Sequence, residues 1–158
     1  MTARLQWMNT DPAAAKAILA MGEYVHNSGL ELSLIDLVLT RVSQINGCAY
    51  CIDMHTKDAR VSGETEQRLY ALNAWEDTPF FSERERAALG WAEAVTLLHE
   101  GRVPDAVYEQ AHFSDEELVK LTMAIVTINT WNRMNVSFRI PAGGYQSRRK
   151  PAAQATVA

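Results

Sequence analysis

Two cysteines and a histidine stand close together in the first half of the chain. Cys48 and Cys51 are the only cysteines of the sequence, and His55 follows the second of them after three residues. At about 100° per residue, a helix would place these three side chains within about 60° of one another. A thiol becomes a nucleophile when it loses its proton, and an imidazole one turn away can accept that proton. The spacing therefore favours thiol chemistry on one face of a helix.

Cys48 stands where this helix is expected to begin. Asn46 and Gly47 directly before it both tolerate left-handed backbone geometry, which predicts the end of the preceding helix. Unpaired N–H groups and the helix dipole favour a negative charge at a helix start, and these conditions lower a thiol pKa. On this argument alone, Cys48 should be the more acidic of the two thiols.

Other interpretations of the pair remain open. A Cys-x-x-Cys pair with a histidine four residues later could supply three ligands to a structural zinc ion. A closed zinc site needs a fourth ligand, and the remaining histidines, His26, His99 and His112, show no paired ligand spacing. The cysteines could also be simple buried residues. Because a close pair in a reducing compartment favours redox catalysis or metal binding over a stapling disulfide, we rank redox chemistry first.

Composition narrows the class of protein. The chain has 158 residues, a formal net charge of −4 at pH 7, 47% hydrophobic residues and 22% charged residues. These values fit one globular domain, and the mild acidity argues against a nucleic-acid or anionic-membrane partner. No apolar run approaches the roughly 18 residues of a membrane span, and the N-terminal segment lacks the apolar core of a signal peptide. We therefore expect a cytoplasmic protein.

The elements that must position the cysteines are helical. Apolar residues recur at intervals of three and four almost throughout, which predicts a single all-α domain of about seven helices. The expected helices run from Pro12 toward Val25, from Ser33 to Ile45, from about Cys48 to about Val61, from about Glu64 to Asn73, from Ser82 to before Gly101, from Pro104 to about Ala111, and from Ser114 to before Pro141. No linker divides residues 1–142, whereas residues 143–158 are typical of a flexible or partner-docked tail.

The segment RVSQINGCAYCIDMHTKDAR resembles the core motif of the AhpD-like alkylhydroperoxidases, within the carboxymuconolactone decarboxylase superfamily. The resemblance continues through FFSERERAALGWAEAVT and TINTWNR and covers roughly residues 30–140. It implies a multihelical homo-oligomer, a trimer or hexamer. It also implies a thiol-dependent, peroxiredoxin-type peroxidase that reduces alkyl or hydrogen peroxides while the cysteine pair cycles between dithiol and disulfide.

The same resemblance assigns roles to individual residues. It implies Cys51 as the peroxidatic nucleophile and Cys48 as the resolving thiol that meets an external dithiol reductant, with no metal or organic cofactor. His55 would withdraw the Cys51 proton and would be oriented by an acid twelve residues before Cys48. That position is usually glutamate and here is Asp36, whose carboxylate reaches about 1.5 Å less far. Closer helices or a bridging water would then complete the relay.

Tyr50 is a second departure from the family pattern. It stands between the cysteines, where the best-characterised type of AhpD has a histidine, and a phenol with a pKa near 10 shuttles protons poorly at neutral pH. We therefore expect a weaker peroxidase or an altered substrate. Three alternatives to a peroxidase stay open: a disulfide reductase of a partner protein, a non-redox lactone decarboxylase or isomerase, and a zinc-stabilised helical assembly module.

Overall fold

The computed structural model describes residues 2–151. Within these residues, every regular element is a helix. The elements are α1 (Trp7–Thr10), α2 (Pro12–His26), α3 (Leu32–Ile45), α4 (Ala49–Val61), α5 (Glu66–Ala71), the 3₁₀ helix η1 (Leu72–Asp77), α6 (Glu83–Leu97), the 3₁₀ helix η2 (His99–Gly101), α7 (Asp105–Glu109) and α8 (Asp115–Ser137). The predicted all-α fold is confirmed, and α2 to α8 correspond to the seven expected helices.

Local capping explains where most helices begin. The Asp11 carboxylate accepts hydrogen bonds from two backbone N–H groups in the first turn of α2, and Pro12 occupies the first helical position. Capping boxes start α6 at Ser82 and α8 at Ser114. Some boundaries differ from the expected ones. Helix α3 begins at Leu32, so Ser33 lies inside its first turn instead of capping it. Helix α5 begins at Glu66, and α6 already ends at Leu97.

Two short elements have no counterpart among the expected helices. The four residues of α1 form one turn before α2 and bury Trp7. After α5 the chain continues as η1 to Asp77, four residues beyond the expected end at Asn73, with a kink at Ala74. Elements of four to six residues carry too few apolar positions for a periodic signal, so the sequence pattern does not reveal either element.

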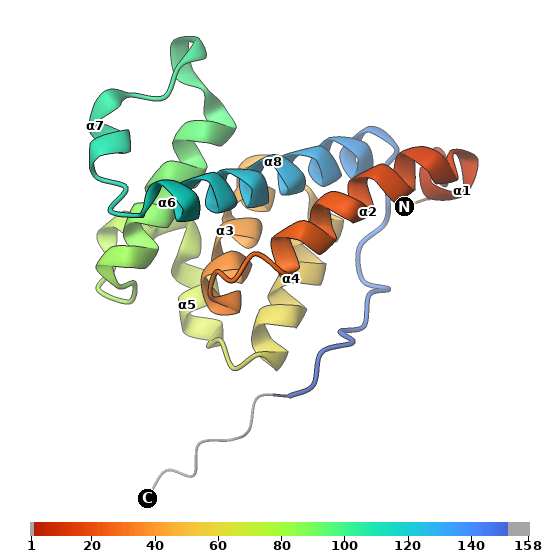
Figure 1. Ribbon diagram of the computed structural model, residues 1–158. Coiled ribbons are helices and arrows are strands. Elements are labelled where there is room, and N and C mark those ends of the chain that lie inside the picture. Colours follow the sequence, from red (N-terminus) through yellow and green to blue (C-terminus); the bar gives the residue numbers. More distant parts are fainter. Residues whose placement is uncertain (1, 152–158) are drawn as a thin grey trace, which may run out of the picture.

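Helix α3 is the central element of the fold. It packs against α4, α6 and α8, and α2 packs against α8 (Figure 1). Leu37, Val38 and Val42 of α3 are completely buried, as expected for a helix with neighbours on several sides. Asp36 is buried on the same helix, and a buried carboxylate must find a partner.

The connection between α3 and α4 places the cysteines. Gly47 adopts a φ of 65°, a left-handed conformation that glycine reaches without strain, and α4 starts directly afterwards with Cys48 as its N-cap residue. Asn46 and Gly47 therefore end α3 as predicted. Because α4 turns back against α3, Cys51 and His55 face the interior of the helical bundle.

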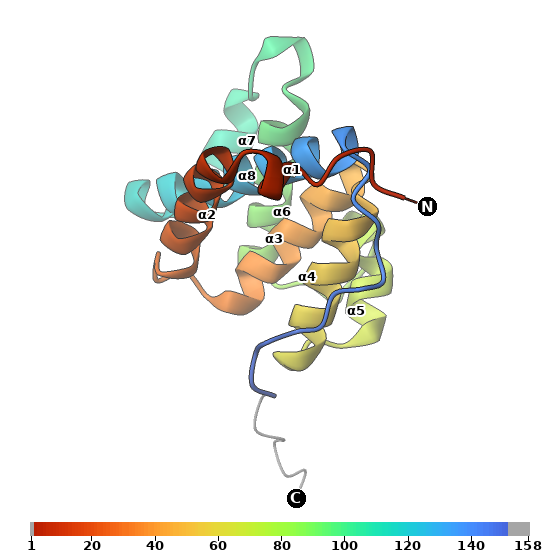
Figure 2. The ribbon, with the colours of Figure 1, turned by 90° about the vertical axis from the view of Figure 1, so that its right-hand side faces the viewer.

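Residues 143–151 fold back onto their own chain. They run along α4 (Figure 2), where the Gly143 N–H donates to Asp53 Oδ2 at 3.0 Å and the Lys57 ammonium donates to the Tyr145 carbonyl at 3.0 Å. Thus the described part of the segment expected as a flexible or partner-docked tail contacts α4. The rest of that segment, 152–158, lies outside the described residues.

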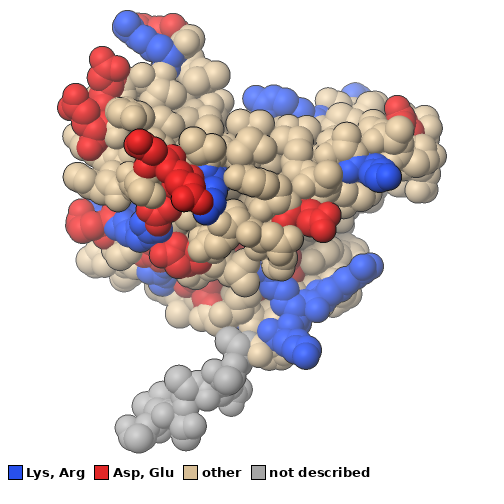
Figure 3. Space-filling model, in the orientation of Figure 1, with Lys and Arg blue, Asp and Glu red and all other residues tan. Residues whose placement is uncertain are grey.

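The surface carries both charged and apolar side chains. Acidic and basic side chains are intermingled on the face shown in Figure 3. No helix in the described part of the chain is both long enough and apolar enough to span a bilayer. Leu19 and Tyr24 on α2, and Val119 and Val126 on α8, are exposed apolar residues. Such residues would give self-association a physical reason, and the trimer or hexamer stays a prediction.

Candidate active site

The two cysteines lie inside the core at the start of α4. Cys48 is 1% exposed and Cys51 0% exposed, and both are reduced. The Cys48 sulfur caps the helix by accepting a hydrogen bond from the Cys51 backbone N–H at 3.4 Å. Val38 and Ile125 belong to the apolar cluster that contains both cysteines. The pair is therefore shielded from water and positioned by a backbone contact.

Asn135 on α8 points a hydrogen-bond donor at Cys51. Its Nδ2 lies 3.4 Å from the Cys51 sulfur, while its Oδ1 accepts a hydrogen bond from the Trp7 indole N–H at 3.2 Å. An indole nitrogen can only donate, so this contact requires the amide oxygen to face Trp7 and the NH₂ group to face the sulfur. Helix α1 thereby contributes to the site by orienting Asn135.

A second amide network lies beside the pair. Asn132 Nδ2 donates to Ser43 Oγ at 3.1 Å, and Asn132 Oδ1 accepts from Asn46 at 3.0 Å. Asn46 also donates to Asn129 at 2.9 Å. In the sequence, Asn132 stands out only as part of the family-like segment TINTWNR, and no pattern predicts a role for Asn135. Three asparagines spaced three residues apart on an otherwise apolar helix face are the signal that could have identified them.

These contacts make the two thiols unequal. The Cys48 thiol donates to the Cys51 sulfur, and together with the amides of Asn135 and Asn132 it lowers the pKa of Cys51 to about 7, in spite of burial. The same contact between the sulfurs, with burial, raises the pKa of Cys48. These contacts favour the thiolate at Cys51, whereas the helix dipole considered alone favours it at Cys48.

Substitution of Asn135 with leucine is expected to raise the pKa of Cys51 by about one unit. A hydrogen bond to a charged group contributes about 1.5–3 kcal/mol, and one pKa unit corresponds to about 1.4 kcal/mol. The measurement is the rate of Cys51 alkylation against pH, made in the Cys48→Ser background. In that background, half of Cys51 should be thiolate at about pH 7 with asparagine at position 135. With leucine there, this midpoint should lie about one pH unit higher. Coincident profiles would show that the amide does not stabilise the thiolate.

His55 is the third residue on this helix face, one turn after Cys51. It is 7% exposed, and neither ring nitrogen has a hydrogen-bond partner. Burial lowers the pKa of His55 to about 4, Asp58 opposes this shift, and Arg149 adds to it. His55 is therefore a neutral imidazole at physiological pH. It can accept a proton, but no carboxylate orients it.

A small apolar pocket lies against His55. Its volume is about 180 Å³, and its walls come from α2, α3, α4, α8 and the C-terminal segment. The apolar lining includes Val25, Leu39 and Trp131, and the charged group at its edge is Arg149. The unpartnered imidazole thus lies, with His26 and Thr127, in the wall of a pocket large enough for a small organic group.

Asp36 is bound to the C-terminal segment. Its carboxylate is 1% exposed and accepts from both terminal nitrogens of Arg149, at 2.5 and 2.9 Å. Burial raises the pKa of Asp36, and the Arg149 guanidinium opposes that shift. The structure thus brings Cys48 and Cys51 together, places His55 one turn beyond them, and pairs Asp36 with Arg149 without a hydrogen bond to His55. The relay from Asp36 through His55 to Cys51 stays a prediction.

Tyr50, between the two cysteines, is half-buried. Burial raises the pKa of its phenol, so the hydroxyl stays protonated at neutral pH.

The zinc alternative requires a group of metal ligands. Among residues 2–151, no three side chains of His, Cys, Asp or Glu are grouped so that they could hold a metal ion. The described residues therefore offer the zinc-stabilised module no ligand set.

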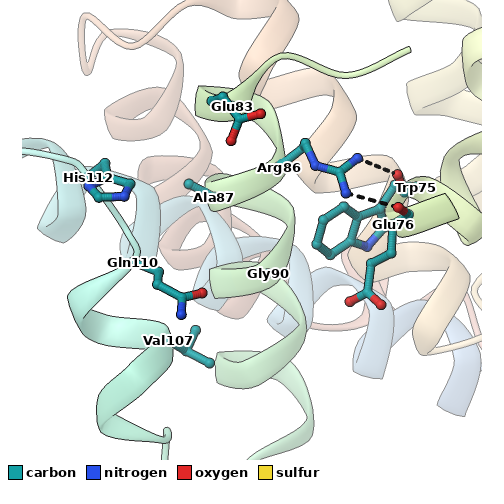
Figure 4. A pocket seen from close by; sticks show the side chains of 9 residues that line it. All are labelled: Trp75, Glu76, Glu83, Arg86, Ala87, Gly90, Val107, Gln110 and His112. Carbon is teal, nitrogen blue, oxygen red and sulfur yellow. Dashed lines mark hydrogen bonds between the residues drawn. The ribbon is translucent and has the colours of Figure 1, made fainter. Parts of the chain in front are cut away.

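A second hollow lies on the far side of α6, away from the cysteines. Figure 4 shows its lining between η1, α6 and α7, where Arg86 donates to the backbone carbonyls of Trp75 and Glu76 at 2.9 Å. Its volume is about 580 Å³, and His112 forms part of its wall. It contains none of the predicted site residues and no thiol. Its one cation among the lining residues, Arg86, donates to backbone carbonyls, and Glu76 and Glu83 also line the hollow.

The fold and the buried dithiol together define the class of protein. An all-helical domain with two cysteines at a helix start and a histidine one turn later matches the arrangement that the sequence resemblance implies. The chain belongs to the carboxymuconolactone decarboxylase family, whose model matches residues 12–94. The family membership expected from the motif is confirmed.

Individual relatives agree with this assignment. YdfG of Bacillus subtilis (strain 168), an uncharacterized protein, is 42% identical over 139 residues, which are 87% of this chain and 95% of YdfG. The crystal structure of ATU0492 from Agrobacterium tumefaciens, a protein of unknown function for which antioxidant defence as an AhpD is suggested, superimposes with a TM-score of 0.88 at 45% identity. That match covers 91% of this chain and 100% of ATU0492.

A more distant structure shares the fold alone. An uncharacterized peroxidase-related protein from Ralstonia eutropha JMP134, with an alkylhydroperoxidase AhpD core, matches with a TM-score of 0.77 at 19% identity, over 87% of this chain and 74% of that one. The predicted AhpD-like fold is therefore confirmed. The family and the fold together support an enzyme with a peroxidase-related activity.

Proposed function

We propose that this protein is a thiol-dependent peroxidase that reduces organic hydroperoxides through the Cys48–Cys51 pair. The observation that carries the proposal is the inequality of the two thiols. Cys51 receives donors that lower its pKa to about 7, and its neighbour Cys48 is held in contact with it as a protonated thiol. A nucleophile and a resolving group in one helical turn are what a dithiol peroxidase requires.

In the first step, the Cys51 thiolate attacks the terminal oxygen of the peroxide. A sulfur–oxygen bond forms, the oxygen–oxygen bond breaks, and the leaving alkoxide takes a proton to become an alcohol. Cys51 is oxidised to a sulfenic acid and the peroxide is reduced. His55, with both ring nitrogens unpartnered, accepts the Cys51 proton and returns one to the leaving oxygen.

In the second step, Cys48 attacks the Cys51 sulfenic acid. A disulfide forms, and the sulfenic oxygen departs with the Cys48 proton as water. An external dithiol then reduces the disulfide by exchange and restores both thiols. Because both sulfurs are buried in the reduced protein, we expect the start of α4 to open before the reductant reaches them.

The proposal is tested by one turnover of the reduced protein under anaerobic conditions. One equivalent of tert-butyl hydroperoxide should yield one equivalent of alcohol, the loss of two titratable thiols, and an intact mass lower by two hydrogens. Retention of both thiols after exposure to excess peroxide would reject a peroxidase. Reduction of an added low-molecular-weight disulfide under those conditions would then favour the disulfide reductase.

Substitution of Leu39 with tryptophan is expected to slow the reduction of organic peroxides more than the reduction of hydrogen peroxide. Leu39 is half-buried in the wall of the pocket beside His55, and a larger ring there would fill space that an alkyl group needs. We expect kcat/KM to fall about tenfold or more for tert-butyl hydroperoxide and by less than about twofold for hydrogen peroxide.

Leu19→Trp is the matched control for this substitution. Leu19 is exposed on α2 and does not line the pocket, so the same change in size should leave both rates unaltered. Equal losses for both peroxides in Leu39→Trp would show that the alkyl group does not occupy this pocket.

A further inference from the structure

The C-terminal segment contributes a cation to the dithiol site. Arg149 holds the buried Asp36 carboxylate with its two terminal nitrogens, and one of these also donates to Ser62 Oγ at 3.0 Å. Its remaining nitrogen, Nε, lies 4.0 Å from Asp58 Oδ2. One guanidinium from residue 149 therefore connects a carboxylate of α3 with a carboxylate of α4. The Arg149 side chain is three-quarters buried, so these contacts are shielded from solvent.

Tyr145 reinforces this arrangement at Asp58. Its hydroxyl lies 2.9 and 3.0 Å from the two carboxylate oxygens and donates to Asp58. Asp58 follows His55 by three residues on α4, so both side chains lie on one side of that helix. The Asp58 carboxylate, whose charge acts on the imidazole, and the Asp36 carboxylate are thus both bound by residues of the C-terminal segment. Neither makes a hydrogen bond to His55, whose ring nitrogens stay unpartnered.

Arg149 also faces His55 directly, because the two side chains line the same pocket. The titratable and charged groups around the imidazole come from four parts of the chain, and α8 contributes only uncharged side chains to this pocket. These groups are Asp58 on α4, His26 on α2, Arg149 itself, and Asp36 on α3 through its bond to Arg149. Arg149 is the cation among them that approaches both the imidazole and a carboxylate.

We propose that Arg149 is a positioning residue of the dithiol site, whose guanidinium holds Asp36 in a two-nitrogen fork and thereby fixes a positive charge in the wall of the His55 pocket. The inference rests on the proposed peroxidase function, because it concerns the residue that accepts the Cys51 proton. Each Asp36 oxygen accepts a hydrogen bond from Arg149, and neither ring nitrogen of His55 has a hydrogen-bond partner. In this state His55 is neutral and without an orienting partner. Displacement of Arg149 would leave Asp58 without this cation, and the charge of Asp58 favours the imidazolium.

The charge on Arg149 acts in the same direction. A cation beside the pocket disfavours protonation of the imidazole, and it contributes to the lowered pKa of His55. Removal of that cation makes His55 a stronger base. An imidazolium one turn from Cys51 then favours the thiolate, so the same change lowers the pKa of Cys51. Undocking of the C-terminal segment would therefore raise the reactivity of Cys51.

The test is the pKa of His55 in the full-length protein, measured by nuclear magnetic resonance from the imidazole proton shifts. The chain has four histidines, and the His55 signal is identified by its loss in a His55→Gln variant. In Arg149→Gln we expect the His55 pKa to rise by about one unit or more. The pH midpoint of Cys51 alkylation, measured with Cys48→Ser in both proteins, should move down in parallel.

Arg148→Gln is the matched control. Arg148 precedes Arg149 in the chain, carries the same charge and is exposed, so its loss should change the His55 pKa by less than about 0.3 units. Arg149→Lys keeps the charge without the planar fork and should give a smaller rise of the same sign. It also serves as a second variant if Arg149→Gln does not fold. An unchanged His55 pKa in the folded Arg149 variants would overturn the proposal.

This readout does not depend on a peroxide. If the His55 pKa rises but the two thiols do not react with peroxide, Arg149 still controls the pKa of His55 and the proposed peroxidase is rejected. Peroxide reduction together with an unchanged His55 pKa in the Arg149 variants would preserve the peroxidase and reject the positioning role. A structural ion pair alone would lower the melting temperature in Arg149→Gln without moving either titration.

Discussion

Substitution of Cys51 with serine is expected to abolish peroxide reduction, with a loss of turnover of about 10³-fold or more. The sulfur of Cys51 receives a hydrogen bond from Asn135, and its pKa is lowered to about 7, so a large share of it is thiolate at neutral pH. A serine hydroxyl in the same place does not ionise near neutrality, and the donors around it cannot supply a nucleophile. The measurement is consumption of tert-butyl hydroperoxide at a fixed concentration of dithiol.

The loss in Cys51→Ser must be separated from unfolding. The exchange of sulfur for oxygen preserves the shape of the side chain, and the hydroxyl can still accept the hydrogen bond from Asn135. The melting temperature should therefore stay close to that of the unmodified protein. Full activity in a folded Cys51→Ser variant would show that Cys51 is not the nucleophile.

The helix boundaries could be predicted from the sequence because they depend on contacts between residues close in the chain. Asp11, Ser82 and Ser114 each accept hydrogen bonds from backbone N–H groups two or three residues later. The start of α4 is equally local, since Gly47 supplies a left-handed residue and Cys48 the cap. Such contacts leave a signature within four residues, and these elements lie where the pattern places them.

The partners of the site residues could not be predicted in this way. Asn135 donates to Cys51 across 84 positions of sequence, and Arg149 holds Asp36 across 113. Helical periodicity shows that Asp36 shares α3 with buried residues, but it does not show which distant side chain will face it. The family motif ends before residue 149. It therefore gives Asp36 a role toward His55 and does not reveal the guanidinium that binds it.

The acidity of the thiols depends on contacts that the helix-dipole argument leaves out. Cys48 is the N-cap of α4, as the dipole argument assumes. The dipole is a diffuse influence of about 0.3–1 kcal/mol, whereas a hydrogen bond to a charged atom contributes about 1.5–3 kcal/mol. Cys51 has such donors in Asn135 and in the Cys48 thiol itself. The contact between the two sulfurs and the donor from Asn135 therefore favour Cys51 as the thiolate.

Substitution of Cys48 with serine is expected to preserve the first step of the reaction and to remove the second. Cys51 should still consume one equivalent of peroxide, but its sulfenic acid has no neighbouring thiol to condense with. The sulfenic acid should accumulate and be captured by a dimedone-type reagent. Excess peroxide should then oxidise it further to sulfinic acid, which would end activity. Disulfide formation within the chain should be absent.

Cys48→Ala is the matched variant, because it separates the resolving role of Cys48 from its hydrogen bond to Cys51. Serine keeps a donor for the Cys51 sulfur and is a favoured N-cap residue, so the pKa of Cys51 should stay near that of the unmodified protein. Alanine lacks both properties, and should raise the pKa of Cys51 and reduce the stability of α4 by about 1 kcal/mol. Peroxide consumption by Cys48→Ser without any sulfenic acid at Cys51 would contradict the assignment, since the oxidised sulfur would then have to lie elsewhere.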